Sequence, residues 1–269
     1  MKIEMKKNAS VLILAVRSCF YKCLGVMALT VAAEFILFAV SALRQGIPSL
    51  EKAFTGSGIP LMAGIGALII LFLLTVPWSP QKKSRPILMV WRLGISNKAA
   101  VIIITAYNFC IFIIFWAFEI LAALLMSAVF LGMTHAANAL QIIYLAFFRV
   151  GFLHSLLPLS DLLMLLRVIL NIFVLALSAT TEVFSHERFL NRRFSAWFYI
   201  YFTAVLILSN WCELPGDIFS VITSMVFALC MATVWICQII VSFRSKDEPG
   251  EKFPEKKERK SRRKKGAAA

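Results

Sequence analysis

Residues 100–132 read AVIIITAYNFCIFIIFWAFEILAALLMSAVFLG, and Glu119 is the only charged side chain among them. An α-helix needs about 20 consecutive apolar residues to cross the hydrocarbon core of a bilayer. This stretch is long enough to cross that core with a tilt or to project beyond it. Its length and composition are typical of a membrane span and not of a helix in a water-soluble protein.

The whole chain shares this apolar character. Its 269 residues are 60% hydrophobic and only 16% charged, with a mean hydropathy of +0.83. A soluble domain is roughly half apolar and a quarter charged. Apolar runs occur at residues 23–43, 59–78, 100–132, 162–182, 196–212 and 218–242. The sequence therefore predicts an all-helical, multi-pass protein of the cytoplasmic membrane, with six spans in one domain over residues 1–243.

Lysine and arginine are concentrated in the N-terminal segment, the loops at 79–99 and 183–195, and the tail at 244–269. Cytoplasmic loops of membrane proteins carry an excess of these residues. With six spans all four segments fall on one side, so we expect both termini in the cytoplasm. The tail is rich in Lys, Glu, Pro and Ser and is predicted to be disordered. It supplies much of the net charge of +14, so this charge does not predict nucleic-acid binding.

Two segments have alternative interpretations. Residues 133–161 are apolar but contain Arg149 and His154. A seventh span there would place the basic tail outside, against the charge rule. We therefore expect an external interfacial or re-entrant helix after the third span, with a full span as the alternative. Residues 8–22 either lie along the cytoplasmic interface as a helix or extend the first span.

Three charged residues lie inside predicted spans, where an ionisable side chain is costly and commonly functional. Glu34 is near the middle of the first span and is a proton site, a substrate contact or a protonated structural residue. Glu119 lies about 28 Å along the third span, and Arg167 about 9 Å in from the start of the fourth, at 1.5 Å per residue. These two reach similar depth if the spans run in opposite directions. We hypothesise that they pair or line a polar cavity; alternatively, each faces interfacial water alone.

The last span carries small residues four positions apart, at Ser220, Ser224, Ala228 and Ala232. This spacing places them on one face of a helix and allows another helix to approach closely. The preferred interpretation is packing within the chain, and the alternative is a dimer interface.

Sequence signals of an enzyme are weak or absent. The chain contains no G-x-x-x-x-G-K-[ST] loop and no H-E-x-x-H motif, and its six cysteines form no C-x-x-C pair. His154 and Asp161 are a candidate acid–base pair, although ordinary interfacial polar residues are the preferred interpretation. We therefore expect no catalytic residue, metal site or cofactor in this chain and expect that it is not an enzyme.

A short basic and aromatic segment, KKSRPILMVWRLGISNK, occupies residues 82–98 between the second and third spans. Pro86 can begin a helix and Gly94 can end it, and the piece is too short to span the membrane. Tryptophan and arginine are enriched in binding hot spots, so Trp91 and Arg92 are candidate contacts to a partner. The alternative is an interfacial tryptophan anchor beside an arginine that only fixes topology.

The basic start, the six spans and this short R-L-containing helix resemble the permease subunits of type-2 ATP-binding-cassette transporters. The stretch WRLGISNKAAVIIITAYNFCIFIIFWAFEIL is similar to the corresponding region of small bacterial permeases of that kind. By this resemblance residues 86–95 would be the coupling helix and residues 8–22 the elbow helix. The implied docking residues are Pro86, Val90, Trp91, Arg92, Leu93 and Gly94. The family usually carries a re-entrant element between its last two spans, whereas here that turn is only WCELPGD.

The resemblance implies the permease subunit of an exporter that works as a homodimer or heterodimer in the lipid bilayer. A separate P-loop ATPase subunit would bind ATP, and no nucleic-acid partner is expected. Two alternatives remain open. One is a proton-coupled secondary transporter that uses Glu34 and Glu119, and the other is a membrane assembly subunit that transports nothing.

Overall fold

The computed structural model describes residues 2–44, 49–75, 97–134, 138–158, 161–185 and 218–244. Every regular element in these segments is a helix, as the sequence predicts. The long helices are α1 (Lys2–Arg44), α3 (Ile59–Thr75), α5 (Asn97–Thr134), α8 (Leu162–Ser185) and α10 (Ile218–Arg244). The short ones are α2 (Leu50–Thr55), α6 (Ala139–Arg149) and α7 (Gly151–Leu156).

Four of the described helices, α1, α5, α8 and α10, are long and apolar enough to cross a membrane. The apolar helix α3 is shorter, with 17 residues. These helices coincide with five of the six predicted spans, and the predicted span at 196–212 lies outside the described residues. The long apolar helices support a membrane-embedded protein.

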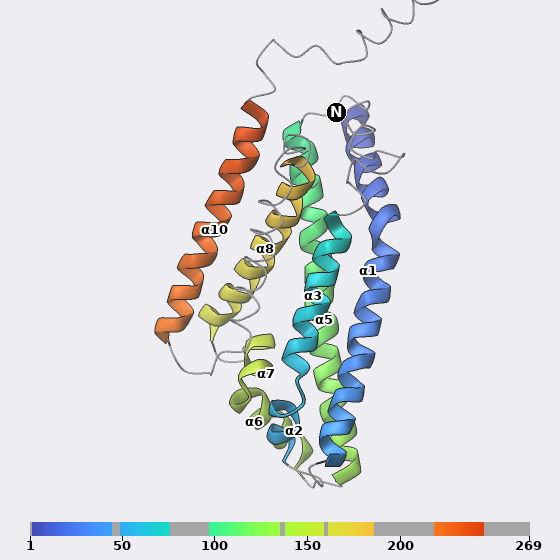
Figure 1. Ribbon diagram of the computed structural model, residues 1–269, viewed down its shortest axis with the longest axis vertical. Coiled ribbons are helices and arrows are strands. Elements are labelled where there is room, and N and C mark those ends of the chain that lie inside the picture. Colours follow the sequence, from blue (N-terminus) through green and yellow to red (C-terminus); the bar gives the residue numbers. More distant parts are fainter. Residues whose placement is uncertain are drawn as a thin grey trace, which may run out of the picture.

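The long helices form an elongated bundle in which α1 and α5 run in one direction and α3, α8 and α10 run in the other (Figure 1). One end of the bundle holds the start of α1 and of α5 and the last residues of α8 and α10, and the shorter α3 runs towards this end (Figure 1). We call this the N-terminal end. The opposite end carries α2, α6 and α7, and we call it the capped end.

The segment between α5 and α8 begins and finishes at the capped end (Figure 1). Its longer helix, α6, has 11 residues and extends about 16 Å, far less than the ~30 Å hydrocarbon core. This length favours the interfacial or re-entrant helix over the full-span alternative for residues 133–161. The helices of this segment instead cover one end of the bundle, where α6 also contacts α2.

Helix α1 is continuous over 43 residues, which corresponds to about 65 Å. Its buried residues recur every three or four positions, which places them on one face: Val11, Ala15, Cys19, Cys23, Met27, Thr30, Glu34, Phe38 and Ser41. Residues 8–22 thus extend the first helix, and the expectation of a separate elbow helix is wrong. The physical reason is that this face continues to pack against α3, where the Cys19 thiol reaches the Leu73 carbonyl oxygen at 3.6 Å.

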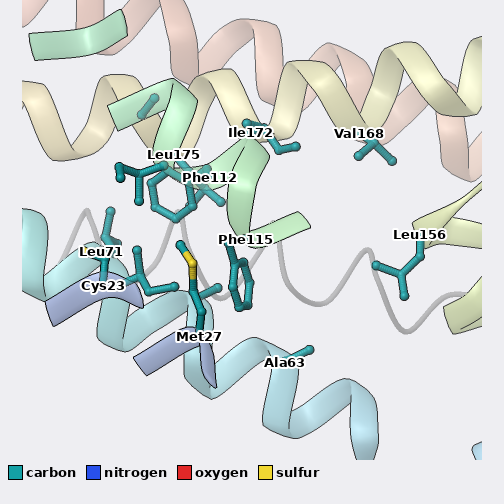
Figure 2. Close-up of a cluster of buried hydrophobic side chains, with 14 of the residues drawn as sticks. Cys23, Met27, Ala63, Leu71, Phe112, Phe115, Leu156, Val168, Ile172 and Leu175 are labelled. Carbon is teal, nitrogen blue, oxygen red and sulfur yellow. The ribbon is translucent and has the colours of Figure 1, made fainter. Parts of the chain in front are cut away.

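The core lies where α1, α3, α5 and α8 meet. Figure 2 shows side chains from these helices gathered together, among them Cys23, Met27, Leu71, Phe112, Phe115, Ile172 and Leu175. Helix α8 is central, since it packs against α3, α5 and α10, and residues 174–183 are all buried. Burial of these side chains removes them from contact with lipid and fixes the relative positions of the helices.

Two glycines have specific structural roles near α3. Gly58 precedes α3 with a φ of 69°, a backbone conformation that only glycine adopts without a steric penalty. Gly66 lies against Thr30 of α1, and a Cβ atom at this position would be 2.6 Å from Thr30 Oγ1. The absence of a side chain at Gly66 therefore sets the close approach of α1 and α3.

The small residues of α10 lie inside the chain. Ser224, Ala228 and Ala232 are buried on the helix that packs closely against α8. Trp235 is buried on the same helix, and it is 2% exposed. This placement corresponds to packing within the chain, the preferred interpretation of the Ser220–Ala232 spacing. The tail at 245–269 lies outside the described residues.

Candidate functional site

The structure brings two membrane carboxyl groups together between α1 and α5. Glu34 and Glu119 are 0% and 1% exposed, and their carboxyl groups interact electrostatically with one another. The two residues are neighbours across the contact between α1 and α5, which run in the same direction (Figure 1). The sequence did not predict this neighbour for either residue.

The described residues provide no cation for this pair of carboxyl groups. Ion pairs between described residues join Arg149 to Glu51 at 3.3 Å and His154 to Asp161 at 3.9 Å, and neither involves Glu34 or Glu119. Arg167 is buried and has an interaction of its own, yet it forms no ion pair with Glu119 in the described segments. The interacting group of Glu119 is instead Glu34, and a polar cavity shared by Glu119 and Arg167 stays a prediction.

Most oxygen atoms of the carboxyl pair lack a hydrogen bond within the described part of the chain. Neither Oε atom of Glu34 has a hydrogen-bond partner there, and neither does Oε1 of Glu119. Roughly 90% or more of buried polar groups in proteins are hydrogen-bonded. Buried carboxyl oxygens without a donor are thus an exception that requires a physical explanation.

Apolar layers enclose the carboxyl pair along the bundle axis. One turn beyond Glu34, Phe38 packs against Phe54 of α2 and Phe130 of α5, with ring centroids 5.0 and 6.0 Å apart. On the other side lie the buried core residues around Met27 and Phe115 (Figure 2). The aromatic layer separates the carboxyl groups from the capped end, which keeps them in surroundings of low polarity.

A second polar cluster joins α5 to α8, and its side chains, unlike the carboxyl pair, are hydrogen-bonded. Asn108 Nδ2 donates to Thr180 Oγ1 at 3.1 Å, and the Thr105 hydroxyl is 3.2 Å from the same oxygen. The Thr180 hydroxyl in turn donates to the carbonyl oxygen of Ala176 at 2.8 Å. Satisfied buried networks of this kind fix helix packing, so we interpret the cluster as structural.

Side-chain hydrogen bonds attach the capping helices to the long helices of the bundle. The Ser41 hydroxyl of α1 donates a buried hydrogen bond to the Ala53 carbonyl oxygen of α2, at 3.3 Å. Trp116 Nε1 of α5 donates to the Leu156 carbonyl oxygen at the end of α7, at 2.9 Å. The Arg149–Glu51 ion pair links α6 to α2 at the surface. His154 is buried beside exposed Asp161, but 3.9 Å is too long for a hydrogen bond. The two side chains are therefore close to one another without a direct hydrogen bond.

The predicted docking residues Pro86, Val90, Trp91, Arg92, Leu93 and Gly94 lie outside the described residues. In the chain they lie between the end of α3 and the start of α5, and both of these helix ends face away from the capped end (Figure 1). Within the described segments, no group of three His, Cys, Asp or Glu side chains is placed to hold a metal ion.

Comparison with known proteins gives no relative. No family model matches the chain, and neither a curated protein nor a solved structure matches it.

Proposed function

We propose that this chain is the membrane-spanning permease subunit of an exporter that is powered by a separate ATPase. The observation that supports this proposal is the position of the helix ends on either side of the basic segment at 82–98. The first residues of α5 and the last residues of α10 lie at the N-terminal end, and α3 runs towards that end (Figure 1). All the basic segments therefore adjoin one end of the bundle, and the charge rule assigns that end to the cytoplasm.

The directions of α8 and α10 support the six-span topology that the proposal requires. Both helices run from the capped end to the N-terminal end (Figure 1). Ser185 and Ile218 consequently lie at opposite ends of the bundle. A fifth span at 196–212 would connect them, and the resulting six spans would leave both termini in the cytoplasm.

In the proposed mechanism, ATP binds and is hydrolysed in the partner subunit. Residues 86–95 would dock on that subunit as a coupling helix and would transmit its closure to α3 and α5. The substrate would pass through a cavity formed by the spans, in a dimer of permease chains. Catalysis of hydrolysis would belong to the partner, so this chain would not itself be an enzyme.

The test is an affinity pull-down from native membranes in a mild detergent, comparing the wild type with the Trp91→Ala/Arg92→Glu variant. A matched control makes the same chemical changes at the capped end, as Tyr144→Ala/Arg149→Glu, where both side chains are exposed. We expect the wild type and the control to recover a P-loop ATPase and the docking variant to lose it. A folded wild-type protein that recovers no ATPase would contradict the proposal.

A second candidate function is secondary transport driven by protons, and the meeting of Glu34 with Glu119 favours it. Ionisable residues within spans commonly belong to proton relays of transporters. Transport that continues after ATP depletion and stops when a protonophore collapses the proton gradient would select this mechanism. Transport that stops with ATP depletion while the gradient persists would select the ATPase-driven one.

A further inference from the structure

We propose that Glu34 and Glu119 form a proton-binding site inside the membrane, with a proton held between the two carboxyl groups. The site consists of two buried side chains from α1 and α5 that interact with one another. This inference concerns the bound ligand. It does not depend on whether ATP or a proton gradient powers transport.

A proton supplies what the described surroundings lack, which is a hydrogen-bond donor. An ionised carboxyl group only accepts hydrogen bonds, whereas a protonated one also donates through its O–H. With both groups ionised, two negative charges would face each other, and close carboxylates do not both ionise readily. A proton on one carboxyl group removes this repulsion and gives an O–H that can donate to the other.

The other ionisable groups of the helices around the site do not neutralise it. Helix α3 carries no ionisable side chain. On α1, Lys22 lies 12 positions before Glu34, about 18 Å along the helix. The other acidic and basic groups on these helices whose side chains the structure describes are Arg17 on α1, Glu51 and Lys52 on α2, Lys98 on α5, His154 on α7, and Arg167 and Glu182 on α8. None forms an ion pair with Glu34 or Glu119 in the described segments.

The enclosing layers indicate how a proton would enter and leave. The contact between Phe38, Phe54 and Phe130 blocks the direction of the capped end, and the Thr30–Gly66 contact holds α1 against α3. Because both carboxyl groups are buried, packing contacts such as these would have to open before water reached them. Proton exchange at the pair would therefore accompany a separation of α1 from its neighbours, which links protonation to conformation.

Infrared spectroscopy of the full-length protein in membranes at neutral pH tests the proposal. The C=O stretch of a protonated carboxylic acid is separate from the bands of an ionised carboxylate. We expect this band in the wild type and its partial loss in the Glu34→Gln/Glu119→Gln variant. The Glu51→Gln control, at an exposed ion pair, should retain it. Glu182 is also buried and is present in both proteins. Subtracting the variant spectrum from the wild-type spectrum therefore cancels any band from Glu182. A folded double variant with an unchanged band would overturn the proposal.

Chemical labelling of the wild type keeps the proposal testable if the double variant does not fold. Dicyclohexylcarbodiimide reacts with protonated carboxyl groups in apolar surroundings. The acid proton moves to a carbodiimide nitrogen as the carboxyl oxygen bonds to the central carbon, and the acyl group then shifts to nitrogen as a stable acylurea. Peptide mass spectrometry should locate this adduct on Glu34 or Glu119, and not on Glu51. Labelling that favours Glu51 would contradict a protonated buried pair.

Discussion

Replacement of Gly66 by alanine tests the packing of α1 against α3, which holds the carboxyl pair in place. A Cβ atom at this position would be 2.6 Å from Thr30 Oγ1, 2.8 Å from Thr30 Cγ2 and 3.2 Å from Thr30 Cβ. Both branches of the threonine are therefore too close. The side chain cannot easily rotate away, because its χ1 is restricted by β-branching and its hydroxyl donates to the Val26 carbonyl oxygen at 2.9 Å.

Two opposing effects determine the expected magnitude. Replacing glycine by alanine within a helix gains about 0.8–1.0 kcal/mol in helix propensity. Overpacking of a tight interface typically costs about 1–3 kcal/mol. Contacts as short as 2.6 and 2.8 Å to both branches favour the upper part of that range, so we expect Gly66→Ala to lower the free energy of unfolding. Gly25→Ala in α1 is the matched control, because a Cβ there meets nothing within 4 Å.

The assay is thermal unfolding of the purified protein in detergent micelles. For a chain of this size each kcal/mol shifts Tm by about 2–4 °C, so we expect Gly66→Ala to lower Tm by several degrees and Gly25→Ala to leave it unchanged or higher. Adding Thr30→Ala to Gly66→Ala should recover most of the loss, since it removes the two closest atoms. If Gly66→Ala were as stable as Gly25→Ala, the described packing of α1 on α3 would be refuted.

Three further predictions use the same unfolding assay. Trp116→Phe removes the hydrogen bond to the Leu156 carbonyl oxygen and should cost about 1–3 kcal/mol, because a buried acceptor loses its donor; an unchanged Tm would contradict this attachment of α7. Arg149→Ala breaks an ion pair whose side chains are 63% and 37% exposed, so its effect should not exceed about 1 kcal/mol. A larger loss would show that the pair is needed to hold the cap. Ala228→Leu adds a larger side chain to the buried α10–α8 interface and should lower the free energy of unfolding by about 1–3 kcal/mol. Leu229→Ala, at a 52% exposed position, should lower it much less. Equal losses of stability would exclude the described orientation of α10.

The helices could be predicted from the sequence because the long apolar runs differ so clearly from the segments between them. The run at 100–132 corresponds to α5, Asn97–Thr134, and the run at 162–182 corresponds to α8, Leu162–Ser185. Charge in the loops also favoured a cap over a seventh span at 133–161, and the short helices α6 and α7 agree with that prediction. Helix α5 begins before its apolar run and finishes after it, and α8 finishes after its run. Local composition does not mark these helix ends.

The continuity of α1 and the partner of each buried acid could not be predicted with the same certainty. Residues 8–22 fit an interfacial helix and an extended span equally well, and tertiary packing against α3 decides between them. The three- and four-residue spacing of buried positions places Glu34 on the packed face of α1, but no local signal sets the register between α1 and α5. Arg167 was suggested as the partner of Glu119 from their similar depth alone. Depth does not specify which face of its helix each residue occupies.

The most direct test of the proposed function is to determine which end of the bundle faces the cytoplasm, since an ATPase can dock only there. Single cysteines are introduced into a variant without native cysteines, as Lys52→Cys and Leu140→Cys at the capped end and Lys98→Cys at the N-terminal end, all exposed positions. Intact cells are treated with a membrane-impermeant maleimide. We predict that the two capped-end cysteines react in intact cells and that the cysteine at position 98 reacts only after permeabilisation. Reaction of the cysteine at position 98 in intact cells would contradict the proposed topology and, with it, the docking of an ATPase at residues 86–95.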